Sequence, residues 1–363
     1  MKNGKVENRQ SVSAQSPITE KKQWLFTLLF VFIAAISVLA IVGQSRDFSI
    51  GNFIDYIKHA SLPWLIAAAV SMIGFIVFEA IALLILCRAF NHKRSFWQGY
   101  SYSVSDIYFS AITPSATGGQ PASAFFMMKD GINGMMATAI LVVNIMMYTL
   151  AIIFIGSICF IFRYDYFLQF STLSKILIAA GFLMQIGLFI FFYMLLKKDK
   201  LLHGICSGFV KFLCKLRILR NREEKLKKLD AYMEKYRQHS KIITGHRKSM
   251  IFCFLFNLLQ RIAQIFVTVF VYAATTGQNI IESVELAFYQ GFVVIGANSV
   301  PIPGSVGVSD FLMLDGFCNI MDRSRAVNLE LLSRSFSFYA CVIICGISML
   351  VSYLVIKRKE RRK

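Results

Sequence analysis

The feature that most constrains this chain is a series of long, unbroken apolar runs. A helix rises about 1.5 Å per residue, so about 20 apolar residues cross the roughly 30 Å hydrocarbon core of a bilayer. The composition agrees, because 56% of the 363 residues are hydrophobic and only 16% are charged. We therefore predict an all-α, multi-pass membrane protein with six full spans. These spans are residues 24–43, 62–87, 135–162, 173–196, 250–276 and 331–356.

Two further apolar stretches, 96–129 and 285–318, are interrupted by proline and glycine. The first break reads Thr-Pro-Ser-Ala-Thr-Gly-Gly-Gln-Pro at 113–121, and the second reads Pro-Ile-Pro-Gly-Ser-Val-Gly at 301–307. Proline removes a backbone donor, and glycine loosens a helix. Non-helical backbone at membrane depth is tolerated only where protein or a water-filled cavity covers it. We predict two re-entrant or broken helical hairpins; the alternative is a pair of ordinary exposed loops.

The basic residues set the expected orientation. Of 39 Lys and Arg, 31 lie in segments that fall on one side of the predicted topology, and the positive-inside rule makes that side the cytoplasm. Both termini are then cytoplasmic, and the net charge of +19 does not indicate nucleic acid as a partner. The basic segments are 1–23, 88–94, Lys129, 197–248 and 357–363.

The chain divides into two membrane halves of the same order: span, span, hairpin, span. The first half is 24–162 with the hairpin 96–129, and the second is 173–356 with the hairpin 285–318. Each half has an odd number of crossings, so we predict an inverted repeat, as in many transporters. Residues 1–23 and 357–363 are basic cytoplasmic tails.

The basic insert 197–248 interrupts the second half. Within it, residues 202–220 carry apolar side chains at helical spacing between lysines and arginines. This pattern indicates an interfacial helix that lies on an anionic leaflet. The alternative is a solvated positive loop.

The sequence carries no pattern of metal or nucleophilic chemistry. None of the five His clusters with Cys or carboxylates at ligand spacing, and no P-loop, GxSxG or HExxH motif occurs. The 8 Cys lie mostly inside apolar runs, which is typical of packing residues. We expect no metal, no cofactor and no catalytic residue.

Ionisable residues within spans are costly and usually face a bundle interior or a cavity. Glu79 and Arg261 lie in corresponding spans, and an unpaired charge there costs about 3 kcal/mol on insertion scales, so we predict that they form an ion pair. Arg334 is expected to extend toward the outer interface. A stripe of Asn257, Gln260, Arg261 and Gln264 is expected to face the bundle.

The two breaks resemble a known family. Residues 113–121, followed by Phe-Met-Met-Lys-Asp-Gly at 126–131, resemble the first signature of the lysylphosphatidylglycerol synthase transmembrane-region family of flippase-like membrane proteins. Residues 301–310 are similar to the second signature, which usually reads Pro-x-Pro-Gly-Gly-x-Gly and ends in Glu. Here Ser305 and Asp310 replace the second Gly and the Glu. The resemblance extends over residues 20–356.

The resemblance implies a role in lipid biochemistry. Full-length synthases of this family add a cytoplasmic aminoacyltransferase domain, which moves lysine from lysyl-tRNA to phosphatidylglycerol. The membrane region is thought to carry the product to the outer leaflet, which confers resistance to cationic peptides. This chain ends seven residues after the last predicted span, so we do not expect the transferase activity from this polypeptide alone.

We expect both hairpin tips to converge on a central cavity that binds a lipid headgroup. Backbone N–H groups at Gly118 and Gly119, with Arg261 as the deep cation, would bind a phosphate, and Asp106 and Asp310 would bind ammonium groups. The alternative is that the glycines allow close helix packing and the acids cap helices. The candidate site residues are Asp106, Thr113, Pro114, Thr117, Gly118, Gly119, Gln120, Arg261, Pro301, Pro303, Gly304, Gly307 and Asp310.

The sequence thus indicates a phospholipid-translocating protein of the bacterial inner membrane, whose partners are the lipid, the anionic leaflet and, in a homodimer, a second copy. One alternative is a phosphatidylglycerol lysyltransferase or its membrane subunit. A second is a small-solute or ion transporter built on the same inverted repeat.

Overall fold

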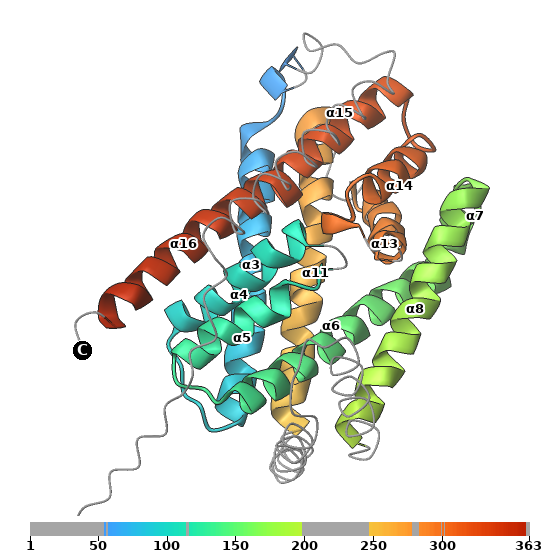
Figure 1. Cartoon of the computed structure of the whole chain (residues 1–363). Coiled ribbons are helices and arrows are strands. Elements are labelled where there is room, and N and C mark those ends of the chain that lie inside the picture. Colours follow the sequence, from blue (N-terminus) through green and yellow to red (C-terminus); the bar gives the residue numbers. More distant parts are fainter. Residues whose placement is uncertain are drawn as a thin grey trace, which may run out of the picture.

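The computed structural model describes residues 54–55, 57–113, 116–197, 247–277, 283–298, 300 and 302–360, and this part of the chain is helical without a β-strand (Figure 1). Five segments in it are long and apolar enough to cross a membrane. They confirm five of the predicted spans, and the predicted span 24–43 lies outside the described residues. The segments are α3 (Leu62–Ala89), α6 (Gly134–Phe162), α8 (Thr172–Lys197), α11 (Arg247–Thr276) and the continuous stretch Arg323–Arg358.

The last of these segments begins earlier than predicted, at Arg323 instead of residue 331. It consists of α15 (Arg323–Arg334), a π-helical turn η3 (Ser335–Ala340) and α16 (Cys341–Glu360). The Asp322 side chain caps its start by accepting a hydrogen bond from the Arg325 N–H at 3.0 Å. The hydropathy of the sequence hides the first turns because they contain Arg323, Arg325 and Glu330, although Glu330 is buried.

Both interrupted stretches are pairs of short helices. The first pair is α4 (Phe96–Ile112) and α5 (Gly119–Lys129), and the second is α13 (Glu285–Ala297) and α14 (Val308–Phe317), with a 3-10 turn η2 (Pro303–Ser305) in the second break. A helix of α5's 11 residues spans only about 17 Å, too little to cross a bilayer. The helices therefore break where the sequence predicted.

The two hairpins enter the bundle from opposite ends. Helices α3 and α11 are antiparallel and pack along their length, since the Ser61 N–H donates to the Ala274 carbonyl at 2.7 Å at one end of the pair. The base of the α13–α14 hairpin lies at that same end, where the Ser171 N–H donates to Asp315 Oδ2 at 2.9 Å. The base of the α4–α5 hairpin lies at the other end, where the chain leaves α3 and enters α6 (Figure 1).

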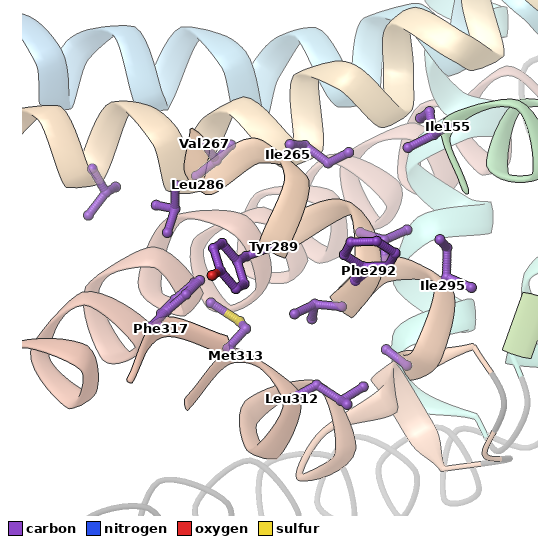
Figure 2. Packing of buried hydrophobic residues seen from close by; sticks show 14 of the residues in the cluster. Ile155, Ile265, Val267, Leu286, Tyr289, Phe292, Ile295, Leu312, Met313 and Phe317 are labelled. Carbon is purple, nitrogen blue, oxygen red and sulfur yellow. The ribbon is translucent and has the colours of Figure 1, made fainter. Parts of the chain in front are cut away.

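The main core surrounds α13. In Figure 2, Tyr289 of α13 lies between Val267 of α11 and Met313 and Phe317 of α14, and Phe292 lies further along α13. These five side chains are all buried. Helix α7 (Tyr164–Gln169) closes one end of this core, where the Tyr289 hydroxyl donates to the Gln169 amide oxygen.

The outward faces of the long helices are apolar. Along α8, for example, Leu173, Ile176 and Leu183 are more than half exposed. Contiguous exposed apolar surface of this kind marks contact with lipid or another protein.

Candidate functional site

The hairpin tips meet through apolar side chains. Ala111 at the end of α4 and Val306 after η2 pack into one small cluster with Phe338 of η3 and Val342 of α16. We call these four residues the tip cluster. The end of α4, just before the first break, thus contacts the second break through apolar side chains. The predicted central cavity lined by polar donors from both breaks stays a prediction.

The turn of the first hairpin is closed by Thr113. Its hydroxyl Oγ1 donates to the Phe109 carbonyl at 2.6 Å and accepts the Gly118 N–H at 2.8 Å. The Gly118 N–H is thus already engaged within the turn, so it does not serve as the anion donor that the sequence suggested. Thr117 is exposed in this turn, and Pro114 lies outside the described residues.

Gly119 allows close approach of α5 to α4. A Cβ atom at this position would lie 2.0 Å from Ser110 Oγ and 2.1 Å from Asp106 Oδ1. The N-terminus of a helix favours negative charge, and at the N-terminus of α5 this charge is the chain's own Asp106 carboxylate. This geometry agrees with the alternative in which Gly119 allows α4 and α5 to pack closely.

Two buried carboxyl groups lie together beside this turn. Asp106 Oδ1 accepts from Ser110 Oγ at 3.0 Å, and Oδ2 accepts from Gln120 Nε2 at 2.7 Å. Glu79 Oε2 of α3 accepts from Gln260 Nε2 of α11 at 2.9 Å. Ser103 of α4, one turn before Asp106, donates from Oγ to Glu79 Oε2 at 3.4 Å, so both acids lie where α3 packs on α4. We call these two residues the carboxyl pair.

Arg261 does not form the predicted ion pair with Glu79. Within the described part of the chain, the two groups do not approach within 4.0 Å; Arg261 Nη1 instead donates to Gln264 Oε1 at 2.6 Å. The guanidinium carbon lies 4.3 Å from the centre of the Tyr148 ring and 5.1 Å from that of Phe75, within cation–π range. Arg261 remains close enough to interact electrostatically with both members of the carboxyl pair.

Glu79 contacts Gln260 instead of Arg261 because neighbouring residues of α11 point in different directions. Successive residues of an α-helix point about 100° apart, because 3.6 residues make one turn. Gln260 faces α3, and Arg261 faces the ring of Tyr148 on α6. The polar stripe faces the bundle as predicted: Asn257, Gln260 and Arg261 are buried, and Asn257 Nδ2 donates to Asn144 Oδ1 at 3.1 Å.

A second buried charge cluster fixes the other hairpin. Arg334 Nε lies 2.7 Å from Asp310 Oδ1, and Asp310 Oδ2 accepts the Gly307 N–H at 2.8 Å at the start of α14. Arg334 is only 8% exposed and lies over Phe338, at 4.6 Å from the ring centre, so it does not extend to the interface as expected. Asp310 thus caps the start of α14 and pairs with Arg334, which agrees with the alternative in which the acids cap helices.

Glu330 is the residue that sequence reasoning missed. It is fully buried beside Asp310 and Arg334. It fell outside the predicted span because charged residues lower the mean hydropathy of its turn. Its spacing of four residues from Arg334, which places the two on one helix face, is the signal that indicates it.

The second break contains three residues in the left-handed region: Gly304 (φ 61°), Ser305 (φ 52°) and Gly307 (φ 83°). Ser305 stands where the family pattern usually has glycine. A Cβ at Gly304 would lie 2.5 Å from the Phe338 ring, so the turn packs tightly on η3. Pro303 begins η2, and Pro301 lies outside the described residues.

Long helices with apolar outer faces and buried charged residues define a multi-pass α-helical membrane protein. A family model described as "Lysylphosphatidylglycerol synthase TM region" matches residues 24–345, so the chain belongs to that family, as its motifs indicated. Neither the comparison with curated proteins nor that with solved structures gave a match. Among the described residues, no group of three or more His, Cys, Asp and Glu is arranged to hold a metal ion.

Proposed function

We propose that this protein is a flippase-like translocase of a phospholipid with a charged headgroup, such as lysylphosphatidylglycerol, in the bacterial inner membrane. The observation that carries the proposal is the meeting of two helical hairpins, from opposite ends of the bundle, at the tip cluster. Transporters with inverted repeats commonly build the substrate site where broken helices meet.

The tip cluster favours movement of the hairpins. The cluster consists of only four buried apolar residues, and each hairpin is interrupted between its own two helices. The two hairpins separate without breaking a helix, which opens a path between the ends of the bundle. Each hairpin is held by buried polar contacts, the Ser103–Glu79 hydrogen bond for the first and the Asp310–Arg334 ion pair for the second.

Arg261 is the proposed contact for the lipid phosphate. Its guanidinium is buried, and its Nε has no hydrogen-bond partner among the described residues. Arginine has five donors, so donors remain after the bond to Gln264. Guanidinium–phosphate contacts are charge-assisted and strong. This assignment replaces the Gly118 N–H, which is engaged by Thr113.

The family to which the chain belongs favours a second candidate, the membrane subunit of a phosphatidylglycerol lysyltransferase. In both cases we place the termini, Lys129 and the insert 197–248 in the cytoplasm, with 202–220 on the anionic leaflet. Export of an aminoacylated lipid would lower the negative charge of the outer surface and so reduce the attraction of cationic peptides. We also propose that two copies of the chain form a homodimer.

The experiment is translocation of a labelled phospholipid in liposomes that contain the purified protein. A membrane-impermeant quencher reports the label in the outer leaflet. We expect movement with the wild type and a loss of at least tenfold in rate with Arg261→Ala. Arg163→Ala, which removes a half-exposed arginine paired with Glu285 at 3.5 Å at the end of the bundle, is the matched control and should keep the wild-type rate. Equal rates in both variants would contradict the assigned contact, and no movement above empty liposomes would contradict the function.

A further inference from the structure

Arg261 is a buried cation without an acid in direct contact. It is 7% exposed, and within the part of the chain that the structure describes no carboxylate oxygen lies within 4.0 Å of its nitrogens. Arg334 is the contrasting case, because it is 8% exposed and its Nε lies 2.7 Å from Asp310 Oδ1. Charged side chains inside a membrane bundle are costly and usually belong to a functional site. The described chain thus supplies a direct counter-charge for Arg334 and none for Arg261.

Two aromatic rings stand at Arg261 where an acid would otherwise be expected. The guanidinium carbon lies 4.3 Å from the centre of the Tyr148 ring on α6 and 5.1 Å from that of Phe75 on α3. A cation–π contact stabilises the charge without a conventional hydrogen-bond acceptor, so the N–H donors of the arginine stay available. Nη1 donates to Gln264 Oε1 at 2.6 Å, and the buried Nε has no hydrogen-bond partner among the described residues. The rings therefore stabilise the cation and leave donors free.

A buried hydrogen bond between α6 and α11 sets the position of Tyr148. Asn257 Nδ2 of α11 donates to Asn144 Oδ1 of α6 at 3.1 Å. Tyr148 follows Asn144 by four residues, and Arg261 follows Asn257 by four residues. Residues four apart lie on the same face of a helix, one turn further along. The asparagine contact thus fixes the register of the two helices in which the Tyr148 ring meets the guanidinium.

Two hydrogen bonds between α3 and α11 set the position of Phe75 in the same way. Ser71 Oγ donates to the Ala263 carbonyl at 2.9 Å, and Glu79 Oε2 accepts from Gln260 Nε2 at 2.9 Å. Phe75 lies midway between Ser71 and Glu79, four residues from each, so it is on the face of α3 that packs against α11. The second ring is therefore held against the guanidinium by contacts on both sides.

We propose that Phe75 and Tyr148 are positioning residues that hold the Arg261 guanidinium, with its donors free, for the phosphodiester of a lipid headgroup. This inference rests on the proposed function. Guanidinium donors match the oxygens of a phosphate, and both partners are charged. The site therefore binds lipids that carry a phosphodiester and rejects lipids without one. Because Arg261 is buried, the phosphodiester reaches it when the surrounding helices separate, and the rings stabilise the cation while the bundle is closed.

The positioning role is tested first without transport. A ligand of the folded state raises the unfolding temperature, so titration of the purified protein in detergent with dihexanoylphosphatidylglycerol gives a half-saturating concentration. We expect Tyr148→Leu to raise this concentration by about threefold or more, because the cation–π contact is lost, and Tyr148→Phe, which retains the ring, to leave it unchanged. A purely structural role would lower the unfolding temperature without lipid and leave the half-saturating concentration as it is.

Two further variants complete this test. Phe75→Leu removes the other ring and should also raise the half-saturating concentration, so the test holds if only one of the two leucine variants folds. Phe125→Leu is the matched control, because it removes an exposed ring 5.6 Å from Lys129 Nζ at the end of α5, and it should bind as the wild type does. An unchanged half-saturating concentration in a folded Tyr148→Leu or Phe75→Leu protein would overturn the positioning role of that ring.

Matched probes identify the group that is bound. Dihexanoylglycerol has the same acyl chains without the phosphate, and glycerophosphoglycerol has the same phosphodiester without the chains. We expect neither to raise the unfolding temperature at concentrations where the phospholipid saturates. Equal stabilisation by dihexanoylglycerol would overturn phosphate recognition. Equal stabilisation by glycerophosphoglycerol would support the arginine site and overturn a lipid as its ligand. Binding that depends on Tyr148, with no lipid movement in liposomes, would support the positioning role and overturn the proposed function.

Discussion

Arg334 and Asp310 form a buried ion pair, with Nε 2.7 Å from Oδ1, that joins the last long helix to the second hairpin. Glu330 lies in the same cluster and is fully buried. The arginine is thus the cation that pairs with Asp310 in an apolar bundle.

Removal of this cation is expected to be costly. Arg334→Met leaves Asp310 without its counter-charge, and we expect a loss of about 3–5 kcal/mol in the free energy of unfolding, as for other broken buried pairs. Arg325→Met removes an exposed pair with Asp322 and should change stability by about 1 kcal/mol or less. Thermal unfolding in detergent measures both. Equal losses would contradict the structural role of Arg334.

Two glycines should respond in opposite directions to alanine. At Gly119 the new methyl group would lie about 2 Å from Ser110 Oγ and Asp106 Oδ1, so we expect Gly119→Ala to destabilise the protein by about 1–3 kcal/mol. At Gly187 of α8 nothing lies within 4 Å of the new Cβ, and alanine should stabilise the helix by up to about 1 kcal/mol. The same unfolding assay compares them. Stabilisation by Gly119→Ala would show that α4 and α5 are not in close contact.

The substitution Ser305→Gly tests whether the backbone of the second break is strained. Its φ of 52° suits glycine, so Ser305→Gly should raise stability by about 1 kcal/mol. Gly307 has open space around it but a φ of 83°, so Gly307→Ala should lower stability by a similar amount. A loss of stability in Ser305→Gly would mean that the serine side chain contributes more than its backbone conformation costs.

The topology is tested by a native cysteine. Cys318 follows α14 and is exposed, whereas the other cysteines of the described part are buried. We expect an external, membrane-impermeant thiol reagent to label Cys318 in intact cells, and Cys318→Ser to abolish this labelling. Partial burial raises the pKa of the Cys318 thiol, so labelling should be faster at higher pH, where more thiolate is present. Labelling only after the cells are opened would contradict the orientation of the second hairpin.

Hydropathy was sufficient for the long helices and the breaks, because lipid-facing and core-facing residues are both apolar in a membrane bundle. It failed for α15, which begins at Arg323 and carries the buried residues Glu330 and Arg334 near its C-terminal end. Composition alone does not distinguish a buried ion pair from an exposed one.

The partners of individual side chains were harder to predict. The pairing of Glu79 with Arg261 was wrong because a rotation of one residue brings Gln260 to Glu79. The free N–H at Gly118 was wrong because Thr113, five residues earlier, turns back to accept it. Both depend on helix rotation and turn geometry, which motifs do not specify.

The most direct test of transport by hairpin movement is a cross-link between the two tips. Ala111 and Val306 share the tip cluster, so cysteines at both positions, in a background without the native cysteines, should react with a short thiol cross-linker. We predict that the cross-linked protein does not move labelled phospholipid in liposomes, that cleavage of the linker restores the rate, and that each single-cysteine variant is unaffected by the reagent. Lipid movement at the uncross-linked rate through the cross-linked protein would contradict transport by separation of the hairpin tips.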